Sequence, residues 1–298
     1  MSVKNYIKAA RLRTLPLSVS GIIVGSFLAY SVNIFMWEIC VLAILTTIGF
    51  QVLSNFANDY GDGIKGTDDN REGEVRMVAS GAITPKQMKL AMLTTTILTL
   101  IFAILLIYAS FGKENLIYSI LFFILGIAAI IAAIKYTVGK SAYGYSGFGD
   151  VFVFLFFGLL SVVGSYFLFT KNVDITVFLP AISIGLLSVA VLNLNNMRDQ
   201  IEDAKNNKNT LVVKIGSQKA KLYHYSLILG ALVCAIIYAK LHSSSLWKYL
   251  FLIAFIPLAL NIKVVAQNIL FRELDSELKK VALSTFLFAI LFGLGQVL

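Results

Sequence analysis

The sequence LIYSILFFILGIAAIIAAIKY, which covers residues 116–136, decides the class of fold. Lys135 is the only charged residue in it, and its apolar side chains do not alternate with polar ones. A helix of about 20 apolar residues crosses the roughly 30 Å of hydrocarbon in a bilayer. Backbone N–H and C=O groups within lipid must form their hydrogen bonds inside the protein. A single stretch without the alternation typical of strands forms these hydrogen bonds as a helix. The stretch therefore predicts a membrane-spanning helix.

The rest of the chain follows the same pattern. The 298 residues are 58% apolar and 14% charged, with a mean hydropathy of +0.82, whereas soluble domains carry about 25% charged residues. We expect an all-α polytopic membrane protein with nine transmembrane helices, forming one domain over residues 1–298. The predicted spans are Leu15–Trp37, Ile39–Asn58, Met88–Ser110, Leu116–Tyr136, Phe148–Phe169, Val173–Met197, Lys221–Lys240, Leu246–Gln267 and Val281–Val297.

The distribution of Lys and Arg predicts the orientation of these spans. With the N-terminus in the cytoplasm, 21 of the 25 basic residues fall on the cytoplasmic side, and only Lys113, Lys171, Lys240 and Lys248 fall outside. Cytoplasmic loops carry such an excess, so the pattern supports the odd number of spans. The net charge of +9 suits an anionic membrane surface. No basic stripe is interleaved with exposed aromatic residues, which argues against a nucleic-acid partner.

Two helix ends on the predicted cytoplasmic side carry matching acidic motifs. The second span runs out through Ser54-Asn55-Phe56-Ala57-Asn58-Asp59-Tyr60-Gly61-Asp62, and the sixth through Asn195-Asn196-Met197-Arg198-Asp199-Gln200-Ile201-Glu202-Asp203. Their polar residues recur every three or four positions, so each set lines one face of its helix. Long polar loops, Asp59–Gln87 and Arg198–Ala220, are expected to follow. The match between spans four helices apart suggests an internal repeat.

Carboxylates in successive helical turns repel one another unless a cation compensates them. Mg²⁺ takes oxygen ligands, typically one or two carboxylates together with substrate phosphates and water. Two facing motifs therefore predict a Mg²⁺–diphosphate site. The alternative, that these residues only terminate two helices, is less favoured because polar residues at membrane depth are costly and usually functional. The predicted metal ligands are Asn58, Asp59, Asp62, Asn195, Asp199 and Asp203, of which Asp62 and Asp199 are the expected catalytic carboxylates; Asp68 is a candidate for a further ligand.

Several cations and aromatic residues near the motifs are candidates for contacts with the substrate. Lys208 follows Asp203 closely and is predicted to bind a diphosphate oxygen and to act in catalysis. Arg76, Arg198 and Asn55 are further candidates for substrate binding, although an ordinary cytoplasmic anchor or, for Arg198, a structural ion pair would explain the two arginines equally. In the Gly- and Tyr-rich loop after the fourth span, Tyr136 is predicted to flank an allylic cation and Tyr145 to bind the substrate, whereas an interfacial aromatic belt is the alternative for either.

With these motifs, the chain resembles the UbiA superfamily of intramembrane aromatic prenyltransferases. Asn58-Asp59-x-x-Asp62 is similar to the family's first Asp-rich motif, and Arg198-Asp199-x-x-x-Asp203 to its second. Arg13-Thr14-Leu15-Pro16, Met77-Val78-Ala79-Ser80-Gly81-Ala82-Ile83-Thr84 and Lys208-Asn209-Thr210-Leu211 extend the resemblance along nearly the whole chain. Gly66 departs from it, because many members carry the last Asp of the first motif there.

The resemblance implies nine helices around a central cavity in a bacterial cytoplasmic membrane, with Mg²⁺ as cofactor and polyprenyl diphosphate as donor. Within the family, the chain resembles most the branch that prenylates an aromatic acid, 1,4-dihydroxy-2-naphthoate, with loss of its carboxylate to give demethylmenaquinone. Another aromatic acceptor such as 4-hydroxybenzoate stays open. Two alternatives lie outside the family: a cation-coupled transporter with Asp62 and Asp199 as ion sites, and a CDP-alcohol phosphotransferase.

Overall fold

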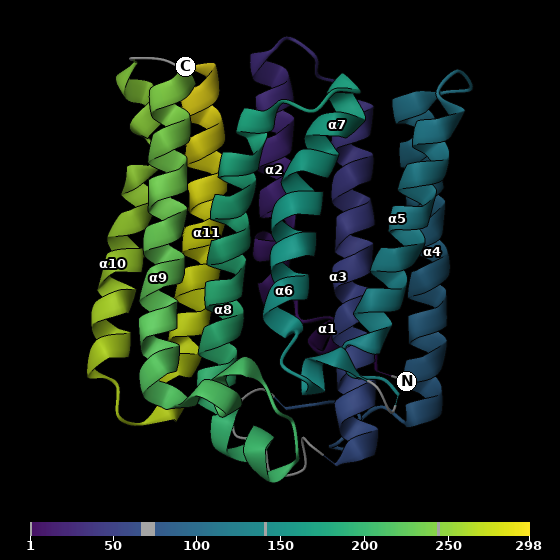
Figure 1. Ribbon diagram of the computed structural model, residues 1–298. Helices are drawn as coiled ribbons and strands as arrows, with labels where there is room; N and C mark the ends of the chain where they lie inside the picture. Colours follow the sequence, from purple (N-terminus) through teal and green to yellow (C-terminus); the bar gives the residue numbers. More distant parts are fainter. Residues whose placement is uncertain (1, 67–74, 140–141, 243–244) are drawn as a thin grey trace.

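A computed structural model describes residues 2–66, 75–139, 142–242 and 245–298, and this part of the chain is helical without any strand (Figure 1). Nine helical segments in it are long and apolar enough to span a membrane, as predicted. The elements are α1 (Val3–Ala10), α2 (Leu15–Ser31), α3 (Trp37–Lys65), α4 (Pro85–Phe111), α5 (Leu116–Lys135), α6 (Gly149–Val153), the π-helix η3 (Phe154–Gly164), α7 (Ser165–Thr170), α8 (Phe178–Lys205), α9 (Leu211–His242), α10 (Leu252–Gln267) and α11 (Leu274–Val297), with short 3₁₀ turns η1 (Leu12–Thr14), η2 (Tyr143–Tyr145), η4 (Ile175–Val177), η5 (Leu246–Tyr249) and η6 (Phe271–Glu273).

The two motif-bearing helices end on the same side of the bundle. In Figure 1 the C-terminal ends of α3 and α8 point to the lower end, where the N-terminus also lies, and the C-terminus lies at the upper end. Nine spans place the two termini of the described chain at opposite ends in this way. The acidic motifs are therefore available to one site.

The boundaries of the motif helices differ from the prediction. The second span was expected to end at Asn58 and the sixth at Met197, but α3 continues to Lys65 and α8 to Lys205. The motifs are polar, yet they stay helical, and Asn55, Asp59, Asp62 and Asp203 are buried within the protein. Gly66 ends α3 in the left-handed conformation, with φ of 71°, and its N–H donates to the carbonyl of Asp62. A glycine takes this conformation without strain, which gives a structural reason for Gly66 at that position.

The first span and α4 begin at recognisable helix signals. The first span is longer than expected, because the short helix α1 and a 3₁₀ turn precede α2, which has Pro16 in its first turn. At α4, the Thr84 hydroxyl accepts from the N–H of Gln87 and the Gln87 side chain accepts from the N–H of Thr84. This reciprocal capping box, followed by Pro85, fixes where the helix starts.

The apolar side chains pack in two groups, and a cavity lies among the helices. The larger group joins α2, α8, α9, α10 and α11 and also includes residues of α3, α4, η3 and α7, whereas the smaller joins α1, α3, α4 and α5. The cavity is lined by residues of α2, α3, α4, α5, α6, η3, α7 and α8. The π-helix η3 contributes Phe156, Phe157, Leu160 and Ser161 to this wall. Such wide turns are uncommon and often occur at functional sites.

Candidate active site

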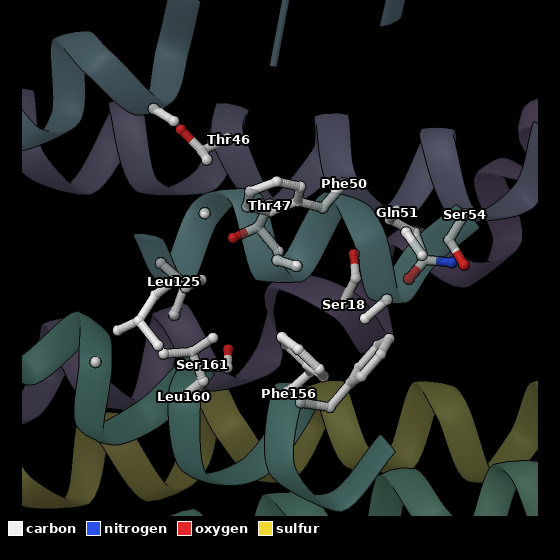
Figure 2. Close-up of a pocket in the computed structure, with 18 of the residues that line it drawn as sticks. Ser18, Thr46, Thr47, Phe50, Gln51, Ser54, Leu125, Phe156, Leu160 and Ser161 are labelled. Atoms are coloured by element: carbon white, nitrogen blue, oxygen red, sulfur yellow. The ribbon is translucent and has the colours of Figure 1, made fainter. Parts of the chain in front are cut away.

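The cavity has a volume of about 340 Å³ and a wall that is mostly apolar. Along α3 it extends from Ala43 to Asn58, which corresponds to about 22 Å at 1.5 Å per residue. Figure 2 shows Gln51 and Ser54 of α3 and Ser18 of α2 near one another, with Phe156 and Leu160 elsewhere on the wall. Gln51, Ser54, Asn55 and Asn58 give the motif end a polar wall. Leu106, Ile107 and Phe122 lie toward the other end, where the hydroxyls of Thr46 and Thr47 are among the few polar groups. The cavity can therefore hold an apolar chain with a polar head at the first motif.

On α3, Asn58 and Asp62 face the loop between α5 and α6. The Thr137 hydroxyl donates to Oδ1 of Asn58 over 3.2 Å and to the carbonyl of Ala57 over 3.0 Å. A Cβ on Gly61 would lie 2.7 Å from the Thr137 hydroxyl oxygen, so glycine permits this close approach. The hydroxyl of Tyr145 donates to Oδ1 of Asp62 over 2.7 Å. Tyr145 thus contacts a predicted metal ligand.

Asp59 has a different environment from the one we expected. Its Oδ1 accepts from the N–H of Val78 over 2.8 Å, and its Oδ2 accepts from the N–H of Met77 over 3.0 Å. The side chain is 1% exposed. The polar residues of this motif were predicted to share one face of the helix. That face is wide enough for Asp59 to point to the turn at residues 76–81 while Asn58 points to Thr137. Asp59 anchors that turn, and we leave it out of the metal site.

Asn55 holds the N-terminal segment and also lines the cavity. Its Nδ2 donates to the carbonyl of Ala10 over 2.8 Å and to the hydroxyl of Thr14 over 3.1 Å, while its Oδ1 accepts from Gln51. Since both amide hydrogens are used by protein groups, Asn55 shapes the polar end of the cavity and has little left to offer a substrate beyond its oxygen.

Tyr145 connects the two acidic motifs. The Lys65 ammonium lies 3.9 Å from the centre of its ring, and the Lys208 ammonium lies 5.6 Å from it. Lys208 also approaches Oδ1 of Asp203 at 3.4 Å, and Lys65 donates to the carbonyl of Thr137 over 2.7 Å. The contacts run from Asp62 through Tyr145 and Lys208 to Asp203. Cations over an aromatic face are attracted to it, so two positive charges are held beside the carboxylates.

On α8, Arg198 is bound to the second motif. Its Nε and Nη2 donate to the two carboxylate oxygens of Asp199 over 2.7 and 2.8 Å, and Nη2 also donates to Oδ1 of Asn195 over 2.8 Å. Its Nη1 donates to Oδ1 of Asp275 at the start of α11. The structure shows the ion pair that the sequence left as the alternative for this arginine.

The remaining candidates lie close to these groups. Tyr136 lines the cavity, and its ring contacts that of Tyr143 edge to face with centroids 5.3 Å apart; Tyr143 in turn stacks on Phe152 at 3.9 Å. Arg76 is buried next to Met77, in the turn that Asp59 anchors. Asp68 lies outside the described residues.

The donors of the two motifs suit Mg²⁺. Asn58, Asp62, Asn195, Asp199 and Asp203 offer amide and carboxylate oxygens, the hard ligands that this ion prefers. Within the described ranges, no three His, Cys, Asp or Glu side chains converge on one point. Mg²⁺ usually keeps several positions for water and substrate phosphate, so one or two carboxylates from each helix are sufficient.

Lys65 and Asp275 were not expected at the site. In the sequence, Lys65 was interpreted as an ordinary cytoplasmic cation. It lies three residues after Asp62, about one helical turn away, and this spacing could have predicted a place beside the motif. Asp275 lies 77 residues from Arg198 in sequence, and nothing in its neighbourhood marks it.

Comparison with known proteins identifies the class. Residues 18–291 match the UbiA prenyltransferase family, and the chain belongs to that family. It is an integral membrane protein, and membership decides against both the transporter and the CDP-alcohol phosphotransferase.

The proteins that are similar in sequence carry a more specific name than the family does. The chain is 42% identical to a 1,4-dihydroxy-2-naphthoate octaprenyltransferase of Haemophilus influenzae, covering 99% of this chain and 96% of that protein. It is 43% identical to the Escherichia coli protein of the same name, over 84% and 80% of the two chains. Among solved structures, a UbiA homologue from Archaeoglobus fulgidus bound to GPP and Mg²⁺ is similar with a TM-score of 0.65 at 15% identity, over 98% and 99% of the chains. At that identity, it supports the fold alone.

The two roles assigned to the carboxylates of α3 can be separated by substitution. Asp59→Asn replaces one acceptor by a donor that faces a buried N–H, and an unpaired buried group costs about 1–3 kcal/mol. We expect a lower unfolding temperature in detergent and faster tryptic cleavage after Arg76. Asp62→Asn is the control, because its amide oxygen still accepts from Tyr145, and its unfolding temperature should stay close to the wild-type value. A stable Asp59→Asn protein that has lost Mg²⁺ affinity would return Asp59 to the metal site.

Proposed function

We propose that the protein transfers a polyprenyl group from polyprenyl diphosphate to 1,4-dihydroxy-2-naphthoate in a Mg²⁺-dependent reaction. One observation carries the proposal: the contacts from Asp62 through Tyr145 and Lys208 to Asp203 join both acidic motifs, and Asp62 lies one helical turn beyond Asn58, which lines the polar end of an apolar cavity. Relatives that are 42% and 43% identical are named for this substrate. An electrostatic site for a diphosphate head adjoins a cavity for a prenyl tail.

The diphosphate is proposed to lie between α3 and α8. Mg²⁺, when bound there by Asn58 and Asp62 on one helix and Asn195, Asp199 and Asp203 on the other, neutralises the diphosphate and makes it a better leaving group. Lys65 and Lys208 lie on the Tyr145 ring between the motifs, where their point charges are available to diphosphate oxygens. Arg76, which is buried in the turn that Asp59 anchors, is proposed as a further contact of the diphosphate.

The reacting carbon is proposed to lie at the polar end of the cavity, near Tyr136. There the bond between the allylic carbon and the diphosphate oxygen breaks, and the diphosphate keeps the electron pair. The aromatic rings of Tyr136, Tyr143 and Phe152 line this end and can stabilise positive charge on the prenyl carbon. The apolar wall excludes water, which would otherwise capture the cation.

The acceptor then forms the new carbon–carbon bond. A ring carbon of the naphthoate attacks the allylic cation, and the carboxylate on that carbon leaves as CO₂, returning its electron pair to the ring. The product of this step is the quinol, so the step itself needs no oxidant; a separate two-electron acceptor would take two electrons and two protons from it to give demethylmenaquinone.

We place the site on the cytoplasmic face of a bacterial inner membrane. The motif ends of α3 and α8 share one end of the bundle with the N-terminus, and that end carries most of the Lys and Arg residues. Soluble acceptor and diphosphate product would then exchange with the cytoplasm, while the prenyl tail stays within the membrane.

The acceptor can be tested by competition. Purified protein receives farnesyl or octaprenyl diphosphate with 1,4-dihydroxy-2-naphthoate, 4-hydroxybenzoate and other aromatic acids, and products are identified by mass. We expect one prenylated, decarboxylated naphthalene product with Mg²⁺ and none after chelation. A prenylated 4-hydroxybenzoate as the main product would change the acceptor, and diphosphate-independent turnover would contradict the reaction.

The metal-site reading is tested by Asp62→Ala and Asp199→Ala. Each is expected to abolish turnover, with kcat lower by at least about 10²–10³-fold, because the leaving group loses its electrostatic stabilisation. Gel-filtration profiles should match those of the wild type, which shows that the protein still folds. Wild-type activity in either variant would remove the carboxylate from the site.

Lys65 is expected to act on the donor alone. Lys65→Met keeps the length of the side chain but removes its charge, and the KM for prenyl diphosphate should rise about tenfold, equivalent to about 1.4 kcal/mol. The KM for the acceptor should change little. Lys205→Met is the matched control, because Lys205 pairs with Glu202 on the exposed surface of α8. Equal effects of the two substitutions would mean that Lys65 contributes only general charge.

A further inference from the structure

The guanidinium of Arg198 occupies donors that the metal would use. Arg198 and Asp199 are adjacent on α8, and neighbouring helical residues do not normally face each other. Even so, Arg198 binds both carboxylate oxygens of Asp199 and the amide oxygen of Asn195. The side chains of Arg198 and Asp199 are 5% and 10% exposed. A cation that binds these oxygens therefore competes with the guanidinium for them.

Asp275 gives the same guanidinium a second anionic partner. It lies in the first turn of α11, accepts a hydrogen bond from Nη1 of Arg198, and is 40% exposed, so that its carboxylate keeps much of its hydration. The nitrogen that binds Asp275, Nη1, is not one of the two that bind Asp199. Arg198 can therefore keep Asp275 while it gives up Asp199.

The position of Asp275 is fixed by a buried network two residues further along. Glu277 accepts from Nδ2 of Asn261 over 2.7 Å, and Oδ1 of Asn261 is 2.8 Å from Nε2 of His224. Lys280 donates to the other Glu277 oxygen. His224, Asn261 and Glu277 are 0%, 1% and 2% exposed, and they join α9, α10 and α11. The first turn of α11 is thus held rigidly against its neighbours.

We propose that Asp275 is a positioning residue that lowers the cost of exchanging Arg198 for Mg²⁺ at Asn195 and Asp199. A buried guanidinium is destabilised by the loss of a carboxylate partner, so an arginine without Asp275 would hold Asp199 more tightly against the metal. With Asp275, the guanidinium retains a carboxylate after the metal takes the motif. This inference rests on the proposed function, because it assumes that the second motif binds a divalent ion.

The test is a titration of the full-length protein in detergent with Mn²⁺ alone, in which electron paramagnetic resonance measures free Mn²⁺. Asp275→Asn is expected to raise the Kd for Mn²⁺ at least about fivefold, and Asp275→Glu to restore it. Glu202→Gln is the matched control, because it also removes one negative charge, here from α8. The Glu202 side chain is 35% exposed and pairs with Lys205, so this substitution should leave the Kd for Mn²⁺ within about twofold of the wild-type value.

In turnover, Asp275→Asn should raise the KM for Mg²⁺ while kcat at saturating Mg²⁺ stays near wild type. If Asp275→Asn does not fold, Asp275→Ser takes its place in each comparison.

A double-mutant cycle separates an effect through Arg198 from a general effect of charge. In the Arg198→Met background the guanidinium is absent, so adding Asp275→Asn should leave the Kd for Mn²⁺ unchanged. If Asp275→Asn weakens Mn²⁺ binding equally in both backgrounds, or no more than Glu202→Gln does, the inference is overturned. Failure of the wild-type protein to bind Mn²⁺ or to form prenylated product would instead overturn the proposed function.

Discussion

The concentration of negative charge at two helix ends is the constraint on which the rest of the site depends. Each carboxylate of the two motifs has a specific compensating group: Tyr145 for Asp62, Arg198 for Asp199, Lys208 for Asp203, and two backbone amides for Asp59. These partners come from α8, from the α8–α9 loop, from the α5–α6 loop and from the turn before α4. Folding the acidic motifs at the membrane boundary therefore brings together segments that are distant in sequence.

The cavity and the charged end perform complementary parts of the proposed chemistry. The apolar wall formed by α3, α5 and η3 suits a prenyl chain and keeps water away, whereas the motif end suits a diphosphate. Tyr136, Tyr143 and Phe152 lie where these two environments meet. This division agrees with the family to which the chain belongs.

The large-scale organisation could be predicted from the sequence because membrane thickness fixes the length of an apolar helix. The run at 116–136 and its eight counterparts gave the number of spans, and because the motifs follow the second and the sixth span, an even number of crossings places them on the side of the N-terminus. Which partner each polar side chain takes could not be predicted in this way. Asp59 binds amides 18 and 19 positions away, Asp62 binds Tyr145 across 83 positions, and Arg198 binds Asp275 across 77. Helical periodicity describes neighbours within one helix and says nothing about these distant contacts.

The left-handed Gly66 that ends α3 has an electrostatic consequence. It stops the helix one turn after Asp62, just as α8 stops soon after Asp203. The carboxyl end of a helix carries about half a negative charge from its aligned peptide dipoles. Both dipoles thus add negative potential to that of the carboxylates. The charges of Lys65 and Lys208, together with divalent ions, would therefore have to offset the backbone as well as the side chains before a pyrophosphate could bind at this mouth.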